Sequence, residues 1–224
     1  MSADHQNSNQ ANPIPHRFIA VEGPIGVGKT TLAKKLAEVL GSELILEQAE
    51  ENPFLERFYQ DPKTGALPTQ LYFLFQRVRQ LQEVRQSDMF SPVRVADYLI
   101  EKDRLFARST LDADELRLYE QVYDNLTIDS PKPDLTIYLQ ASVDVLNNRI
   151  RKRGRTIESP ITKDYLKKIC DAYTDFFYYY DESPLLIVNA SGLDLVENEN
   201  DFSLLLEQIA KTTRGKNYFN PHPA

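Results

Sequence analysis

Five short apolar segments alternate along the chain with longer segments in which apolar residues recur every three or four positions. The short segments predict buried strands, because strands of a parallel sheet are covered on both faces and are apolar nearly throughout. They comprise residues 17–23, 43–47, 93–99, 135–140 and 185–189. The longer segments predict helices at residues 29–40, 68–85, 101–127, 142–152, from 162 onward and at 201–211. The alternation predicts an α/β fold, a five-stranded parallel sheet with helices on both faces.

One domain accounts for most of the 224 residues. Residues 1–16 are rich in Asn, Gln, Ser and Pro and lack the apolar segment of a signal peptide, so we expect a disordered lead-in. Residues 17–212 are the expected domain and residues 213–224 a tail, from which Tyr218 and Phe219 could dock back.

Composition and charge narrow the class of protein. No segment approaches the roughly 18 apolar residues that a membrane helix needs, and the net charge of −7 argues against binding along a nucleic-acid duplex. The only cysteine, Cys170, makes an intrachain disulfide impossible and favours a reducing compartment. We expect a cytoplasmic protein with neither membrane nor nucleic acid as a partner, and a local basic cluster could still bind a small anion.

A phosphate-binding motif follows the first predicted strand. Residues 23–30, GPIGVGKT, match GxxxxGK[ST] completely and precede a predicted helix. Such glycines let backbone N–H groups surround phosphate oxygens at the positive end of a helix dipole. Lys29 should reach the β- and γ-phosphates of ATP, and the Thr30 hydroxyl should bind Mg²⁺. The expected nucleotide contacts in this P-loop are Gly23, Gly26, Val27, Gly28, Lys29, Thr30 and Thr31.

The rest of the sequence favours a small kinase. A GTPase needs Asn-Lys-x-Asp after a strand, and the nearest segment, residues 162–165, reads TKDY. Glu47 ends the second predicted strand, where a carboxylate can take the proton from an attacking hydroxyl. The alternative interpretation of Glu47 is a solvated charge, since Glu50 and Glu51 follow closely.

Other polar residues could bind the metal or the acceptor. Gln70 and Arg77 are seven residues apart on a helix and share a face, from which they can hydrogen-bond a flat heterocycle. Asp97 ends a strand, where a carboxylate can support Mg²⁺ directly or through water. Asp103 could pair with Arg77, although a first-turn helix charge explains its position equally well.

Residues 149–155 hold five cations in seven positions, so the remaining net charge of −7 − 5 is −12. Such a run could bind nucleic acid or simply be solvated. Because it follows a helix and contains Gly154, it also fits a mobile lid whose arginines close over a transferring phosphoryl group. With a P-loop present, we favour a short arginine-rich lid.

From about residue 18 to residue 209 these motifs resemble the deoxynucleoside kinase family. The resemblance implies that Glu47 is the catalytic base and that ATP is the phosphate donor. It implies that the lid surrounds the phosphates and that the segment ending in Phe202 holds the adenine. The residues implied for these roles, besides the P-loop, are Glu47, Arg149, Arg153, Arg155, Asp201 and Phe202.

The resemblance also implies an acceptor site and a homodimer. Tyr59 lies eleven residues before Gln70, as does the family's tyrosine that holds the sugar 3′-hydroxyl, and Glu158 resembles the lid glutamate that reaches the same group. Gln70 and Arg77 resemble the residues that read the base. An Arg–Asp pair goes with deoxypurine or deoxycytidine acceptors, so Arg77 with Asp103 implies deoxyadenosine or deoxyguanosine first and thymidine last.

One departure from the family pattern follows the third predicted strand. The family commonly has Glu/Asp-Arg-Ser there, with the arginine near the base glutamate and the 5′ end of the acceptor, whereas this chain has Asp97-Tyr98-Leu99. Lys102, Arg104 or a lid arginine could replace that arginine, or turnover is reduced.

The predicted reaction is transfer of the γ-phosphoryl group of Mg-ATP to the 5′-hydroxyl of a deoxynucleoside. Two alternatives remain open. A nucleoside monophosphate kinase of thymidylate-kinase type shares the P-loop and lid, but would need cations where the chain has Glu47. A non-catalytic, nucleotide-dependent regulatory module is made plausible by the missing arginine.

Overall fold

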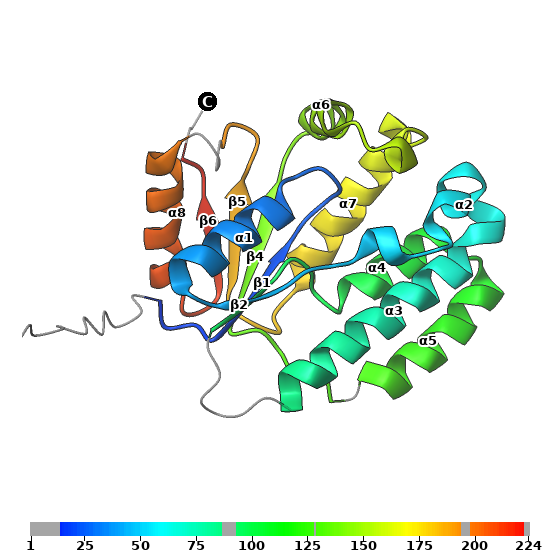
Figure 1. Cartoon of the computed structure of the whole chain (residues 1–224), viewed down its shortest axis with the longest axis horizontal. Coiled ribbons are helices and arrows are strands. Elements are labelled where there is room, and N and C mark those ends of the chain that lie inside the picture. Colours follow the sequence, from blue (N-terminus) through cyan, green and yellow to red (C-terminus); the bar gives the residue numbers. More distant parts are fainter. Residues whose placement is uncertain (1–13, 87–92, 128, 194–197, 222–224) are drawn as a thin grey trace, which may run out of the picture.

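The computed structural model describes residues 14–86, 93–127, 129–193 and 198–221. Six parallel strands form one sheet in the order β2-β3-β1-β4-β5-β6 (Figure 1). The strands are β1 (Phe18–Glu22), β2 (Glu43–Ile45), β3 (Arg94–Ala96), β4 (Leu135–Gln140), β5 (Leu185–Asn189) and β6 (Lys216–Phe219). The α-helices are α1 (Lys29–Leu40), α2 (Leu55–Gln60), α3 (Pro62–Gln86), α4 (Lys102–Thr110), α5 (Ala113–Thr127), α6 (Val143–Arg153), α7 (Lys163–Tyr179) and α8 (Glu199–Lys211). The predicted fold class is therefore confirmed.

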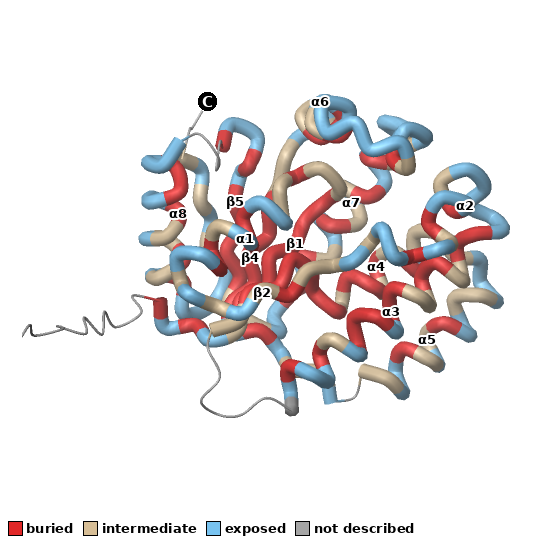
Figure 2. The backbone as a smooth tube through the Cα atoms, in the orientation of Figure 1, coloured by how far each residue is buried: buried red, intermediate tan, exposed pale blue. Residues whose placement is uncertain are grey.

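Helices cover both faces of the sheet, and the residues of each strand alternate between the two faces. In β1, Ile19 and Val21 pack into a core with residues of α1, α6 and α8. Ala20 belongs to the opposite core, with residues of α4 and α7. The continuous stretch of buried backbone through the sheet in Figure 2 follows from this double cover.

A third core lies beside the strands β2 and β3, from which Ile45 and Ala96 contribute to it. Leu74 and Val78 of α3 pack there against Tyr119 and Tyr123 of α5, and Tyr98 lies among them. The long helix α3 thus has one side in a core, while polar residues of the same helix line a cavity.

The expected number of five strands is wrong, because residues 216–219 of the predicted tail add β6 to the sheet. Lys216 pairs with Leu185 and Phe219 with Val188. Only Tyr218 and Phe219 are large and apolar here, so backbone hydrogen bonding to the edge of β5, and little apolar patterning, makes this strand. Phe219 packs against the first core, as the possibility of docking back anticipated.

Two further boundaries differ from the expectation. Ile14 is buried, and the ring nitrogen Nε2 of the buried His16 lies 3.2 Å from the carbonyl oxygen of Ile209, so the packed chain begins before residue 17. The helical region predicted at 101–127 is two helices, because the Asp112 carboxylate accepts hydrogen bonds from the backbone N–H groups of Asp114 and Glu115 and caps α5. The lead-in expected at residues 1–13 lies outside the described residues.

Candidate active site

The P-loop joins β1 to α1 and needs its first two glycines for space as well as conformation. Gly23 has φ 149° and Gly26 has φ 82°. A Cβ at Gly23 would lie 2.4 Å from the carbonyl oxygen of Leu139, and one at Gly26 would lie 2.8 Å from Cγ1 of Ile150. The loop therefore packs directly on β4 and α6, which fixes the backbone N–H groups around the phosphate position.

Lys29 begins α1 and folds over the P-loop. Its Nζ donates a 2.7 Å hydrogen bond to the carbonyl oxygen of Gly23. Burial lowers the pKa of Lys29 to about 8. The ammonium group lies at the junction of two cavities, because Lys29 lines both.

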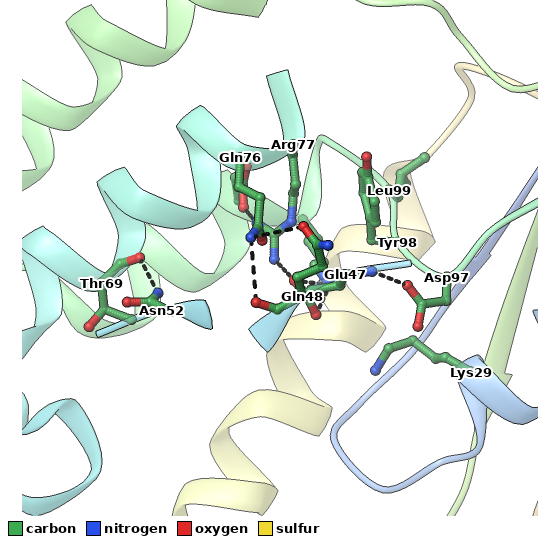
Figure 3. A network of polar contacts seen from close by, with 12 residues as sticks. Lys29, Glu47, Gln48, Asn52, Thr69, Gln76, Arg77, Asp97, Tyr98 and Leu99 are labelled. Atoms are coloured by element: carbon green, nitrogen blue, oxygen red, sulfur yellow. Dashed lines mark hydrogen bonds and ion pairs between the residues drawn. The ribbon is translucent and has the colours of Figure 1, made fainter. Parts of the chain in front are cut away.

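Asp97, directly after β3, ties the P-loop to the end of β2. Its Oδ2 accepts a 2.6 Å hydrogen bond from the Thr30 hydroxyl, and its Oδ1 accepts a 2.7 Å bond from the backbone N–H of Glu47. Burial raises the pKa of the Asp97 carboxyl group. Figure 3 shows Asp97 beside Glu47, with Lys29 below it.

The residues near Thr30 fit a magnesium ion that arrives with a nucleotide. Mg²⁺ prefers oxygen donors and is commonly held by one or two protein groups together with phosphates and water. The Thr30 hydroxyl and the Asp97 carboxylate supply such oxygens. Within the described ranges, no cluster of three or more Asp, Glu, His or Cys side chains could hold a metal alone, which agrees with this arrangement.

A cavity of about 280 Å³ extends from the P-loop toward α2, α3 and α7, which is close to the lower end for a small-molecule site. Glu47 lies in its wall, two residues past β2. The Glu47 carboxylate forms ion pairs with Arg77 of α3 and with Lys102 of α4, whose Nζ is 3.1 Å from Oε1. Glu47 is therefore bound into the site, and the interpretation as a solvated charge is wrong.

Gln70 and Arg77 both line this cavity, as their shared helix face predicts. Arg77 also forms an ion pair with the fully buried Asp103, so the predicted pairing is confirmed. Asp103 itself does not line the cavity, but its ion-pair partner Arg77 does. The amide nitrogen of Gln70 lies 3.4 Å from the Thr110 hydroxyl oxygen, so its carbonyl oxygen is left for other partners.

The arginine-rich segment contributes Arg153 and Arg155 to the lining of the same cavity. Nε of Arg153, the last residue of α6, donates a 3.1 Å hydrogen bond to Glu158, which is buried. Arg155 forms an ion pair of 2.9 Å with Glu50. Tyr59 lines the same cavity, and burial raises the pKa of its hydroxyl, so this group stays protonated. The lid arginines Arg153 and Arg155 and the residues predicted to bind the sugar, Tyr59 and Glu158, therefore line one cavity.

A second cavity, of about 480 Å³, lies on the other side of the P-loop and is lined in part by Thr31, Arg149 and Leu193. Arg149 donates hydrogen bonds to the carbonyl oxygens of Val27 and Ala190, and so joins the P-loop to the segment after β5.

Asp201 and Phe202, the residues implied for the adenine loop, follow β5 along the chain. Both are buried in the first turn of α8, and neither lines the second cavity. Phe202 packs into the core, where its ring also lies 5.0 Å from Nζ of Lys35. Both side chains are buried, so contact of this segment with adenine stays a prediction.

A family model for deoxynucleoside kinases matches residues 19–214. The chain belongs to the deoxynucleoside kinase family. It is 38% identical over 200 residues to a deoxyguanosine kinase of Bacillus subtilis, which covers 86% of this chain and 95% of the relative. It is 33% identical over 212 residues to a deoxyadenosine kinase of Lactobacillus acidophilus, covering 88% and 97% of the two chains.

A solved structure of deoxyadenosine kinase from M. mycoides with bound dATP is similar to the kinase described here. The TM-score is 0.75 at 28% sequence identity, over 87% of this chain and 99% of that chain. The protein is thus an ATP-dependent kinase that phosphorylates a deoxynucleoside, which supports the first predicted reaction over its two alternatives. In the part of the kinase that the structure describes, no helix has the length and apolar character to cross a membrane.

Sequence reasoning missed several residues that line the 280 Å³ cavity. Phe73 lines it, and its ring lies 4.9 Å from the guanidinium carbon of Arg77. Phe73 is three residues after Gln70 and four before Arg77, so the helical period that linked those two could also have found it. Phe106 and Tyr165 also line the cavity, but they come from α4 and α7 and carried no local signal.

Proposed function

We propose that this kinase transfers the γ-phosphoryl group of Mg-ATP to the 5′-hydroxyl of deoxyadenosine or deoxyguanosine. The observation that carries the proposal is Glu47, a carboxylate in the wall of the 280 Å³ cavity, which we call the acceptor cavity. The backbone N–H of Glu47 donates to Asp97, which in turn binds the P-loop residue Thr30. An alcohol needs such a base, whereas a phosphate acceptor is already deprotonated.

In the proposed reaction the 5′ oxygen forms a bond to the γ-phosphorus while the bond from that phosphorus to the bridging oxygen of ADP breaks. Glu47 takes the hydroxyl proton. Lys29, Arg153 and Arg155 stabilise the charge on the phosphoryl oxygens. Bound Mg²⁺, supported by Thr30 and Asp97, supplies further charge neutralisation at the phosphates.

The charge balance around Glu47 favours a neutral acceptor. Lys29, Arg77 and Lys102 are cationic, and the neighbouring carboxylates outnumber them: Glu22, Glu47, Asp97 and Asp103. A monophosphate would bring two more negative charges next to these carboxylates.

The preference for a purine base rests on the relatives and on α3. The similar proteins named above are deoxyguanosine and deoxyadenosine kinases. Gln70 offers a carbonyl oxygen and Arg77 a guanidinium to the edge of a base. Tyr59 and Glu158 are proposed to bind the 3′-hydroxyl, because both line the same cavity.

We also propose a cytoplasmic homodimer. Tyr178 and Tyr179, at the end of α7, are 72% and 79% exposed, and exposed aromatic residues are enriched at interfaces. Light scattering of the purified chain should give twice 25.8 kDa, and cell fractionation should place the protein with cytoplasmic ATP-consuming enzymes.

A coupled ADP-release assay with Mg-ATP tests the reaction. The acceptors are the four deoxynucleosides and, separately, their 5′-monophosphates. Turnover with deoxyadenosine or deoxyguanosine and none with monophosphates is expected. Turnover with monophosphates alone would assign the chain to the nucleotide kinases and would exclude Glu47 as a base.

A further inference from the structure

Tyr98, which stands where the family pattern has an arginine, is a core residue. Its side chain is 1% exposed and packs with Leu74 and Val78. Its hydroxyl donates a 2.9 Å hydrogen bond to Oε1 of Gln80, whose amide nitrogen binds the carbonyl oxygen of Leu46. Tyr98 therefore supports the segment after β2 through Gln80, and it brings no charge to the cavity.

Lys102 brings a charge to the same place from one turn further along the chain. The backbone N–H of Lys102 donates to the carbonyl oxygen of Leu99, so the chain turns after Leu99 and α4 begins. The Lys102 side chain is 3% exposed and lines the acceptor cavity. Its Nζ lies 3.1 Å from Oε1 and 3.2 Å from Oε2 of Glu47, and thus bridges both oxygens.

The other candidate cations are engaged elsewhere. Arg104 forms an ion pair with Asp124, and its guanidinium carbon lies 4.3 Å from the ring of Tyr123, away from the cavity lining. Arg153 pairs with Glu158 and Arg155 with Glu50, so neither contacts Glu47. Among the three replacements that the sequence left open, only Lys102 contacts Glu47.

Glu22 holds Lys102 on its other side. Its carboxylate is fully buried at the end of β1. Oε1 accepts hydrogen bonds from the Gly23 backbone and the Tyr173 hydroxyl, and Oε2 accepts one from the Leu99 backbone. Lys102 Nζ lies 3.7 Å from Oε2. Because three fixed donors hold Glu22, it is a rigid support for the ammonium group.

We propose that Lys102, supported by Glu22, is the residue that positions the Glu47 carboxylate for proton transfer, in place of the arginine missing after Asp97. An adjacent cation favours the ionised carboxylate, the form that accepts a proton. A bridge across both oxygens also fixes the orientation of the carboxylate, and misplacing a catalytic group by about 1 Å can cost about 100-fold in rate. The inference rests on the proposed function of Glu47.

Steady-state kinetics of four variants test this role at saturating Mg-ATP. Lys102→Met removes the charge, Lys102→Arg keeps it, and Glu22→Gln keeps the shape of the support without its charge. Arg104→Met is the matched control, because it removes a cation two residues away that contacts Asp124 instead. Thermal unfolding and ATP binding are measured for each variant.

Lys102→Met is expected to lower kcat about 100-fold with ATP affinity within about twofold of the wild type, and Lys102→Arg to recover at least a tenth of wild-type kcat. Glu22→Gln should lower kcat by roughly tenfold, and Arg104→Met should change it less than twofold. Folded Lys102→Met with near-normal kcat would overturn the proposal. If Lys102→Met does not fold, a folded Lys102→Arg variant with less than a hundredth of wild-type kcat would overturn it as well. Failure of the proposed role of Glu47 is distinct, since Glu47→Gln would then keep a near-normal kcat.

Discussion

The guanidinium of Arg77 forms an ion pair with the carboxylate of Glu47, from α3 to the end of β2. Its other terminal nitrogen pairs with Asp103 on α4. One side chain therefore binds both the proposed base and the buried carboxylate behind the acceptor cavity. Substitutions of either carboxylate will act in part through Arg77, and stability and turnover should be measured together.

Replacing the proposed base should separate binding from chemistry. Glu47→Gln keeps hydrogen-bonding groups beside Arg77 and Lys102 but cannot take a proton. We expect kcat to fall between about 100-fold and 10,000-fold, with the dissociation constant of ATP unchanged. Glu56→Gln, on the exposed side of α2, is the control. Near-normal kcat in Glu47→Gln would exclude Glu47 as the base.

Breaking the buried pair should reduce both stability and base selectivity. Asp103→Asn leaves Arg77 with Glu47 as its remaining carboxylate partner. Removing one member of a buried pair costs about 3–5 kcal/mol in the free energy of unfolding, and the Glu47 contact should keep the loss near 3 kcal/mol. Urea unfolding measures that loss, and kcat/KM for deoxyadenosine and thymidine should move closer together. An unchanged selectivity ratio would contradict a role for this pair in base choice.

Activity should decline at alkaline pH because buried lysines lose their protons. Burial lowers the pKa of Lys29 and of Lys102 to about 8. The protonated fraction of each falls as the pH rises through that value, so kcat/KM should fall with it. The titratable and charged groups around Lys102 are Glu22, Lys29, Glu47, Arg77, Asp97, Tyr98 and Tyr173.

Bound ATP separates the two lysines. We expect its phosphates beside Lys29, where negative charge would raise the pKa of that residue, so at saturating Mg-ATP the decline near pH 8 should belong to Lys102. In Lys102→Arg the guanidinium stays charged, and the decline should move to higher pH. The same midpoint in both proteins would contradict the assignment to Lys102.

Tyr98→Phe should reduce stability and spare catalysis. The variant removes the hydrogen bond to Gln80 and keeps the packed ring. We expect a loss of about 1 kcal/mol in the free energy of unfolding and a kcat within about twofold of the wild type. The control is Tyr218→Phe, at an exposed side chain. A large loss of kcat in a stable Tyr98→Phe protein would argue that Tyr98 acts in the reaction itself.

The sequence predicts those parts of the kinase in which one segment carries the whole signal. Apolar segments identify five strands, because a buried parallel strand must be apolar whatever its neighbours are. The P-loop is a complete local motif, and Gln70 and Arg77 share one helix face. Each of these expectations agrees with the structure.

The features that the sequence does not predict depend on contacts between distant segments. Lys102 and Glu47 are in contact although 55 residues separate them in the sequence, so residue spacing could not distinguish Lys102 from Arg104. Strand β6 forms through backbone hydrogen bonds, which have almost no side-chain signature. The side chain of Phe202 packs in the core, and its place in a motif-like segment did not indicate that packing.

The strand order sets the separation between the strand that carries the P-loop and the strand that leads to Glu47. β1 carries the P-loop and β2 leads to Glu47, and β3 lies between them. Two inter-strand spacings therefore separate the two strands, roughly 9.5 Å. Backbone hydrogen bonds fix this separation between the strands. Side-chain substitutions on α3 and α4 can therefore change which base is accepted without changing the separation. Acceptor choice and transfer distance are thus set by different parts of the fold, and each can be redesigned while the other is kept.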